Sequence, residues 1–129
     1  MRSTRMWFAL LLLCAMSPLT AAIKSVTLHT ASAESFEAHV AGPANPVGAI
    51  VLVHDWFGVS PFYEAATERL AGMGYLVVAV DLYGGRRATT HEEAAALLGS
   101  VHDDLAGRQL DAALRWAAER SGRAWCYWS

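Results

Sequence analysis

The sequence predicts an α/β fold in which helices flank a mostly parallel sheet. Two continuous apolar runs rich in β-branched residues, 48–53 and 75–80, are typical of strands that are covered on both faces. A segment with helical periodicity lies between them, and a strand, helix, strand unit leaves its two strands parallel. The chain has 129 residues, of which 54% are apolar, so it is long enough for one such domain and its core.

The first 22 residues are expected to lie outside this domain. Two arginines precede the apolar run 6–16, and a proline and small residues that end at Ala22 follow it. This order is typical of a secretory signal peptide, and the run is much shorter than the ~20 residues of a membrane-spanning helix. We therefore expect cleavage after Ala22, a secreted or periplasmic domain over 23–129, and no membrane contact after cleavage.

Three strands are expected to open the domain. Apolar and polar residues alternate over 25–29 and 36–40, which predicts two half-buried strands paired antiparallel at an edge of the sheet. Turn residues over 41–46 separate them from the apolar run 48–53. That run predicts a central parallel strand.

Three helices follow from their start and stop signals. A Ser-Pro pair at 60–61 begins a helix that ends at Gly72. A capping box over 90–93 begins a second helix that ends near residue 98. An amphipathic pattern predicts a third helix over about 103–119. The large apolar residues most simply interpreted as core are Phe62, Tyr75 and Trp116.

The α/β pattern calls for another buried strand after the third helix. Gly122 suits the C-terminal stop of that helix, but only seven residues follow it and they begin with Arg123. They contain no aliphatic run. We therefore expect no strand there.

Charge and residue spacing argue against several classes of partner. Without residues 1–22 the chain loses two arginines and no acidic residue, so its net charge changes from −2 to −4. A nucleic acid is therefore not an expected partner. The histidines are scattered singly without the spacing of metal ligands, and we expect neither a metal nor a cofactor. Cys126 is the one cysteine of residues 23–129, so no internal disulfide can form there.

Polar and aromatic residues follow both buried runs, where ligands bind in a parallel sheet. They read HDWFG over 54–58 and DLYGGR over 81–86. A nucleotide site would need a glycine-rich turn in the first segment, which instead has one glycine and three bulky side chains. An acyl-transfer enzyme needs a backbone N–H there to hold a developing oxyanion, and that interpretation fits better.

Together these motifs resemble the N-terminal half of the dienelactone hydrolase family. The matches are HDWFG at 54–58 against the family's H-E-x-F-G, Gly74-Tyr75 before the second buried run, and DLYGGR at 81–86 after it. The resemblance covers about 48–123. It implies an α/β-hydrolase-type sheet, here its first half only, and hydrolysis of a small-molecule ester or lactone by a Cys, Asp, His triad.

The resemblance also implies roles for individual residues. Trp56 matches the residue whose main-chain amide contributes to the oxyanion hole, and Asp55 matches a glutamate that exchanges a proton with the resting thiol. Arg86 falls within one residue of an arginine that holds the substrate carboxylate. The residues themselves leave plainer interpretations open: Asp55 could cap a turn or pair with an arginine, and Arg86 could be a solvated loop charge. His54 is expected to be a packed, hydrogen-bonded residue at the strand end rather than a base.

Cys126 matches the middle of the family's nucleophile motif, G-x-C-x-G-G. Ala124 and Trp128 stand where that motif has glycines, and no residue matches the triad Asp or His. We interpret Cys126 as the remnant of a nucleophile motif, or a chance likeness of it, in a truncated or frame-disrupted hydrolase that is inactive by itself. The alternative is a non-catalytic exported α/β module or a degradation fragment.

Overall fold

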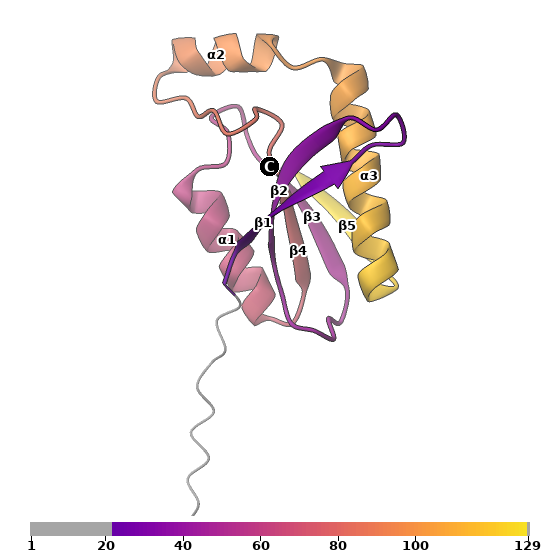
Figure 1. Cartoon of the computed structure of the whole chain (residues 1–129). Coiled ribbons are helices and arrows are strands. Elements are labelled where there is room, and N and C mark those ends of the chain that lie inside the picture. Colours follow the sequence, from indigo (N-terminus) through magenta and orange to yellow (C-terminus); the bar gives the residue numbers. More distant parts are fainter. Residues whose placement is uncertain (1–21, 129) are drawn as a thin grey trace, which may run out of the picture.

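A five-stranded mixed sheet forms the centre of the structure, a computed structural model that describes residues 22–128 (Figure 1). The sheet has the strand order β1-β2-β4-β3-β5. Strand β2 is antiparallel to β1 and β4, whereas β3 is parallel to β4 and β5, so the strands other than β2 share one direction. The predicted α/β fold with a mostly parallel sheet is confirmed. The strands are β1 (Lys24–His29), β2 (Ser35–Ala41), β3 (Ala49–Val53), β4 (Leu76–Val80) and β5 (Ala124–Trp128).

Helices cover the two faces of the sheet and the ends of its parallel strands. Helix α1 (Pro61–Gly72) packs on β4 and β2, and α3 (Asp103–Ser121) packs on the opposite face. The short helix α2 (His91–Gly99) lies beyond the carboxyl ends of β3 and β4 (Figure 1). The loops that leave those strands therefore lie between the sheet and α2.

Strand β4 is the centre of the core. All five of its residues are buried. Val78 and Val80 pack in the cluster on the α3 side, whereas Val77 and Ala79 pack in the cluster on the α1 side. Successive side chains of a strand point to opposite faces, so a strand between two helix layers must be apolar at every position. This confirms the interpretation of the apolar run.

The helix signals act largely as predicted. Pro61 occupies the first turn of α1, although the Ser60 side chain makes no capping hydrogen bond. The Thr90 hydroxyl accepts a hydrogen bond from the backbone N–H of Glu93. Gly122 ends α3 with φ of 71°, a left-handed conformation that glycine adopts at little cost.

The prediction that no strand follows Gly122 is wrong. Strand β5 pairs with β3 over its whole length, from Ala49 opposite Ala124 to Val53 opposite Trp128. Aromatic residues have high β propensity, and the free edge of β3 offers them a partner. The ring of Trp125 lies over Gly48, where a Cβ atom would be only 2.5 Å from it.

The interpretation of Phe62 as a core residue is also wrong. Its side chain is 69% exposed, whereas Tyr75 and Trp116 are half-buried. Tyr63 and Thr67 form the buried face of α1. Phe62 is adjacent to Tyr63 in sequence, so the helical rotation of about 100° per residue turns it away from the sheet.

No helix of the described residues is both long and apolar enough to cross a membrane. The segment predicted as a signal peptide lies, except for Ala22, outside the described residues.

An ion pair joins the β1–β2 turn to α3. Arg108 donates from Nη2 to Oε1 of Glu34 at 2.6 Å and from Nε to Oε2 at 3.0 Å, and the Thr30 hydroxyl donates to Oε2 at 2.7 Å. The Arg108 guanidinium, followed by the Thr30 hydroxyl, lowers the pKa of Glu34 from 4.5 to about 2. Ionised Glu34 therefore stabilises the folded chain above pH 4.5, and the contribution is lost as the pH falls through about 2.

We predict that the effect of Glu34→Gln on the unfolding free energy is constant above pH ~5 and shrinks toward zero as the pH falls from ~4.5 to ~2. Urea unfolding at a series of pH values measures it. Glu68→Gln, at an exposed position of α1 outside this ion pair, is the control for the loss of a carboxylate charge. A Glu34→Gln effect that stays the same down to pH ~2 would contradict the role of this pair.

Candidate active site

Two loops meet at the carboxyl ends of β3 and β4. The parallel register places Val53 opposite Val80, so His54 and Asp81 leave the sheet at the same level. The loop after β3 carries the HDWFG motif, and the loop after β4 carries DLYGGR. Both lie beneath α2 (Figure 1).

Asp81 builds the second of these loops. Its carboxylate is buried and accepts hydrogen bonds from the backbone N–H of Tyr83 at 2.9 Å and of Gly85 at 2.6 Å. Gly84 and Gly85 both have positive φ, 61° and 83°. The carboxylate therefore closes a tight turn that the two glycines make possible.

His54 connects the two loops. Its Nε2 accepts from the backbone N–H of Leu82 at 3.1 Å, so the proton lies on Nδ1, which donates to the Asp55 carbonyl at 2.6 Å. The side chain is 2% exposed, and its ring packs against the Tyr83 ring with 4.6 Å between the centroids. Nε2 is 4.0 Å from the Asp81 carboxylate, but it is an acceptor in this arrangement, so the pair is not ionic. The prediction of a packed, hydrogen-bonded residue at the strand end is confirmed.

Asp55 caps the turn of the first loop. Its Oδ1 accepts from the backbone N–H of Phe57 at 2.9 Å, and its own N–H donates to the Tyr63 hydroxyl at 2.8 Å. This matches the plainer of the two interpretations, a carboxylate that caps a turn. The structure does not bring the Asp55 carboxylate to Cys126, which lies inside β5.

Trp56 lies at the tip of the same turn with its backbone N–H available. This N–H donates to no acceptor among residues 22–128. The Trp56 carbonyl accepts from the Tyr83 hydroxyl at 3.1 Å, and the indole packs edge-on against Phe57 and His91 at 5.5 and 5.3 Å. The peptide is thus held in place while its N–H donates to no group of residues 22–128, as an oxyanion-hole amide requires.

Gly58 lets the two loops touch. A Cβ atom there would lie 2.9 Å from the Arg86 carbonyl and 3.2 Å from the Tyr83 ring, and its φ of 94° favours glycine. In the same region the Ala88 N–H donates to the Phe57 carbonyl at 2.9 Å. The motif glycine therefore has a steric reason that lies in the other loop.

Arg86 is exposed but attached to its surroundings. Its Nε donates to the Tyr83 carbonyl at 3.0 Å and its Nη2 to the Ser100 hydroxyl at 3.1 Å. The neighbouring Arg87 instead pairs with Glu64 of α1 at 2.7 Å. An open hollow of about 530 Å³ lies beside these arginines, and its lining residues are Arg86, Arg87, Thr89, Glu93, Ala96 and Leu97.

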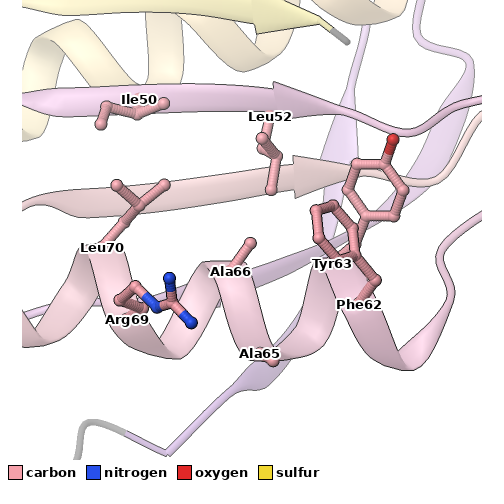
Figure 2. Close-up of a pocket in the computed structure, with 8 residues that line it drawn as sticks. All are labelled: Ile50, Leu52, Phe62, Tyr63, Ala65, Ala66, Arg69 and Leu70. Atoms are coloured by element: carbon pink, nitrogen blue, oxygen red, sulfur yellow. The ribbon is translucent and has the colours of Figure 1, made fainter.

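A second hollow is mainly apolar, and no residue of the two loops lines it. It is a groove of about 430 Å³ between α1 and β3, and Figure 2 shows Leu70 and Ala66 facing Ile50 and Leu52 across it. None of Asp55, Trp56 and Arg86 lines it. The polar groups lie at the loops, so we assign the candidate site there rather than to the groove.

Cys126 lies in the middle of β5, opposite Val51 of β3. Its side chain packs against the core cluster on the α3 side, and this burial raises the pKa of the thiol above its ordinary value of 9.0. The end of β5, Trp128, is level with Val53 and hence with the loops. In α/β-hydrolases the nucleophile lies on a strand-to-helix turn, whereas Cys126 lies inside a strand.

Sequence reasoning missed Tyr83 as a site residue. Its hydroxyl reaches the Trp56 carbonyl from the other loop, and burial, followed by the charge of Asp55, raises its pKa. No local pattern indicates a contact between residues 27 positions apart. The turn formed by Asp81 did have a signal, an aspartate with two glycines three and four residues later.

Within residues 22–128 no three His, Cys, Asp or Glu side chains are grouped so that they could hold a metal ion.

Comparison with known proteins identifies the relatives of this chain. The sequence signature described as "Dienelactone hydrolase family" matches residues 36–124. No curated protein sequence matches. Among solved structures, a Klebsiella pneumoniae protein assigned to the dienelactone hydrolases is 26% identical, with a TM-score of 0.66 over 83% of this chain and 50% of its own.

Two further solved structures share the fold. A dienelactone hydrolase from Anabaena variabilis is 16% identical, with a TM-score of 0.61 over 85% of this chain and 52% of its own. A dienelactone hydrolase-like promiscuous phosphotriesterase from metagenomic libraries is also 16% identical, with a TM-score of 0.62 over 83% of this chain and 49% of its own. The chain thus spans about half the length of these structures, and the predicted α/β-hydrolase-type sheet, present as its first half, is confirmed.

We predict that Gly58→Ala destabilises the chain by about 1–3 kcal/mol more than Gly84→Ala, because its methyl group meets the Arg86 carbonyl and the Tyr83 ring. Gly84 also has positive φ but has open space around it, so it controls for backbone strain. Urea unfolding of both variants measures the difference. Equal losses would mean that the loops do not pack as described.

We also predict slow alkylation of Cys126 in the folded chain. At neutral pH iodoacetamide should react about tenfold or more slowly than in urea, and the rate should still rise above pH ~9, because the raised pKa leaves little thiolate. Mass spectrometry of the tryptic peptide 124–129 separates this thiol from Cys14. Equal rates with and without urea would instead show an accessible thiol whose pKa is not raised by the fold.

Proposed function

Because this chain belongs to the dienelactone hydrolase family, we propose that it contributes two loops to the active site of a carboxylic ester or lactone hydrolase. The loop 54–58 would stabilise the oxyanion, and the loop 81–86 would bind an anionic group of the substrate. The observation that carries the proposal is the backbone N–H of Trp56. It is held at the carboxyl end of a central parallel strand and donates to no group of residues 22–128.

The chemistry of this amide is charge stabilisation. When a nucleophile attacks an ester or lactone carbonyl, the carbonyl oxygen becomes negative, and a preorganised N–H donor lowers the energy of that state. Loss of one such donor typically costs about 2.7–4 kcal/mol of transition-state stabilisation. The resemblance to the family assigns this donor to the main chain of Trp56.

Arg86 is proposed to hold a substrate carboxylate. Its Nε and Nη2 are engaged with Tyr83 and Ser100, which fixes the guanidinium, while Nη1 donates to no group of the described residues. A fixed guanidinium with donors to spare suits a carboxylate. We therefore propose a small ester or lactone that carries a carboxylate.

Cys126 is not proposed to act as the nucleophile. It matches the family's motif, but it lies within a strand with its thiol against the α3 layer and its pKa raised. A nucleophile on a turn after β5 would instead lie level with the Trp56 loop, since Trp128 pairs with Val53. We keep the proton exchange between Asp55 and a thiol as a proposal, with the thiol on such a turn rather than at Cys126. In the structure the Asp55 carboxylate accepts a hydrogen bond from the Phe57 N–H.

The position of Cys126 inside β5 favours a second candidate function, which needs no nucleophile. A non-catalytic exported module would use the same Trp56 N–H and Arg86 to bind a carboxylate without hydrolysing an ester. Export itself is proposed from the first 22 residues, and N-terminal sequencing of the protein from cells should give Ile23 as the first residue.

We predict that binding at the proposed site can be measured without turnover. Phenylphosphonate, whose oxygens resemble an oxyanion, should shift the Trp56 amide resonance saturably in ¹H–¹⁵N NMR spectra. Arg86→Gln should weaken binding of 4-carboxyphenylphosphonate, which adds a carboxylate to the probe, by roughly 10-fold or more, because it removes a charge-assisted contact to that carboxylate. Arg115→Gln, at an exposed position of α3, is the matched control. A Trp56 resonance that does not respond to the probe would refute the proposed site.

We further predict no ester turnover that depends on Cys126. The chain and its Cys126→Ala variant should hydrolyse p-nitrophenyl acetate and a dienelactone at the same background rate, because a triad lacking members loses ~10⁴ or more in kcat. Activity above background that disappears in the variant would contradict this and make Cys126 a working nucleophile.

A further inference from the structure

The direction of the Trp56 N–H is set by the carbonyl of the preceding residue. This N–H and the Asp55 carbonyl belong to one planar trans peptide unit, so they point in opposite directions and turn together. The Asp55 carbonyl accepts from His54 Nδ1 at 2.6 Å and from the Gly58 N–H at 3.2 Å. Whatever holds this carbonyl therefore aims the donor on the other side of the peptide.

The imidazole that holds the carbonyl is itself fixed. Its Nε2 accepts from the Leu82 N–H at 3.1 Å, its ring lies 4.6 Å from the Tyr83 ring between centroids, and the side chain is 2% exposed. Both nitrogens are satisfied only by the tautomer with its proton on Nδ1. The second loop thereby keeps the imidazole proton directed at the Asp55 carbonyl.

We propose that His54 is a positioning residue for the oxyanion donor: its Nδ1–H orients and polarises the Asp55–Trp56 peptide, and the Leu82 N–H holds the required tautomer. This inference rests on the proposed function, because it assigns a task to the Trp56 N–H. A hydrogen bond accepted at the carbonyl also makes the amide N–H of the same peptide a stronger donor. His54 thus acts through Trp56 and does not touch the substrate.

Two substitutions separate this role from simple support of the loops. His54→Asn places a side-chain amide nitrogen near the position of Nδ1, so it keeps the donor to the Asp55 carbonyl and loses the acceptor for Leu82. His54→Gln places a side-chain oxygen near the position of Nε2, so it keeps the acceptor and loses the donor. A merely structural role would make the two variants equivalent at equal stability.

The experiment compares the Trp56 amide resonance, phenylphosphonate affinity and urea unfolding of the full chain and of both variants. We expect His54→Asn to keep the phenylphosphonate affinity within about threefold. His54→Gln should lose about tenfold or more in affinity, which is about the effect of one hydrogen bond to a charged group. In the free protein, His54→Gln should also shift the Trp56 amide proton upfield. Equal affinities in the two variants, or losses that simply follow their unfolding free energies, would overturn the proposal.

A measurement on the unmodified chain covers the case in which neither variant folds. Long-range ¹H–¹⁵N spectra of the imidazole should show a protonated Nδ1 and an unprotonated Nε2, and the opposite tautomer would overturn the proposal. Failure of the proposed function looks different, because phenylphosphonate would then leave the Trp56 resonance of the unmodified chain unchanged. In that case the chemical shift of the Trp56 amide proton in ligand-free His54→Gln would still test whether His54 orients the Asp55–Trp56 peptide.

Discussion

The parallel register of β3 and β4 is the constraint on which the site depends. Because Val53 lies opposite Val80, the two loops leave the sheet together, and each completes the hydrogen bonding of the other. His54 of one loop accepts from Leu82 of the other, and the Tyr83 hydroxyl returns a hydrogen bond to Trp56. Buried polar groups must be paired, so neither loop can reach this conformation alone.

Features with local causes could be predicted from the sequence. The apolar runs marked β3 and β4 because a strand covered on both faces needs apolar residues at every position. Thr90 and Gly122 marked helix ends because caps act on the nearest turn of backbone. The positions of the motif residues Asp55 and Trp56 could also be predicted, because these residues directly follow a strand that the sequence predicts.

Features with distant causes could not be predicted in this way. Strand β5 is a strand because the edge of β3 is open to it, although its aromatic sequence does not resemble the aliphatic core strands. The rotation that exposes Phe62 depends on which face of α1 meets the sheet. Tyr83 supports Trp56 across 27 residues, and this distance hides it from any pattern in the chain.

The contact of Gly58 with the opposite loop has a consequence for inheritance and engineering. The Arg86 carbonyl occupies the space that a side chain at position 58 would need, so the choice of glycine there depends on a distant segment of the sequence. A substitution that lengthens or reshapes the second loop changes what the first can tolerate. The two segments should therefore be transferred together when related enzymes are recombined. A chimera that takes HDWFG from one parent and DLYGGR from another combines loops whose contacting residues did not evolve together.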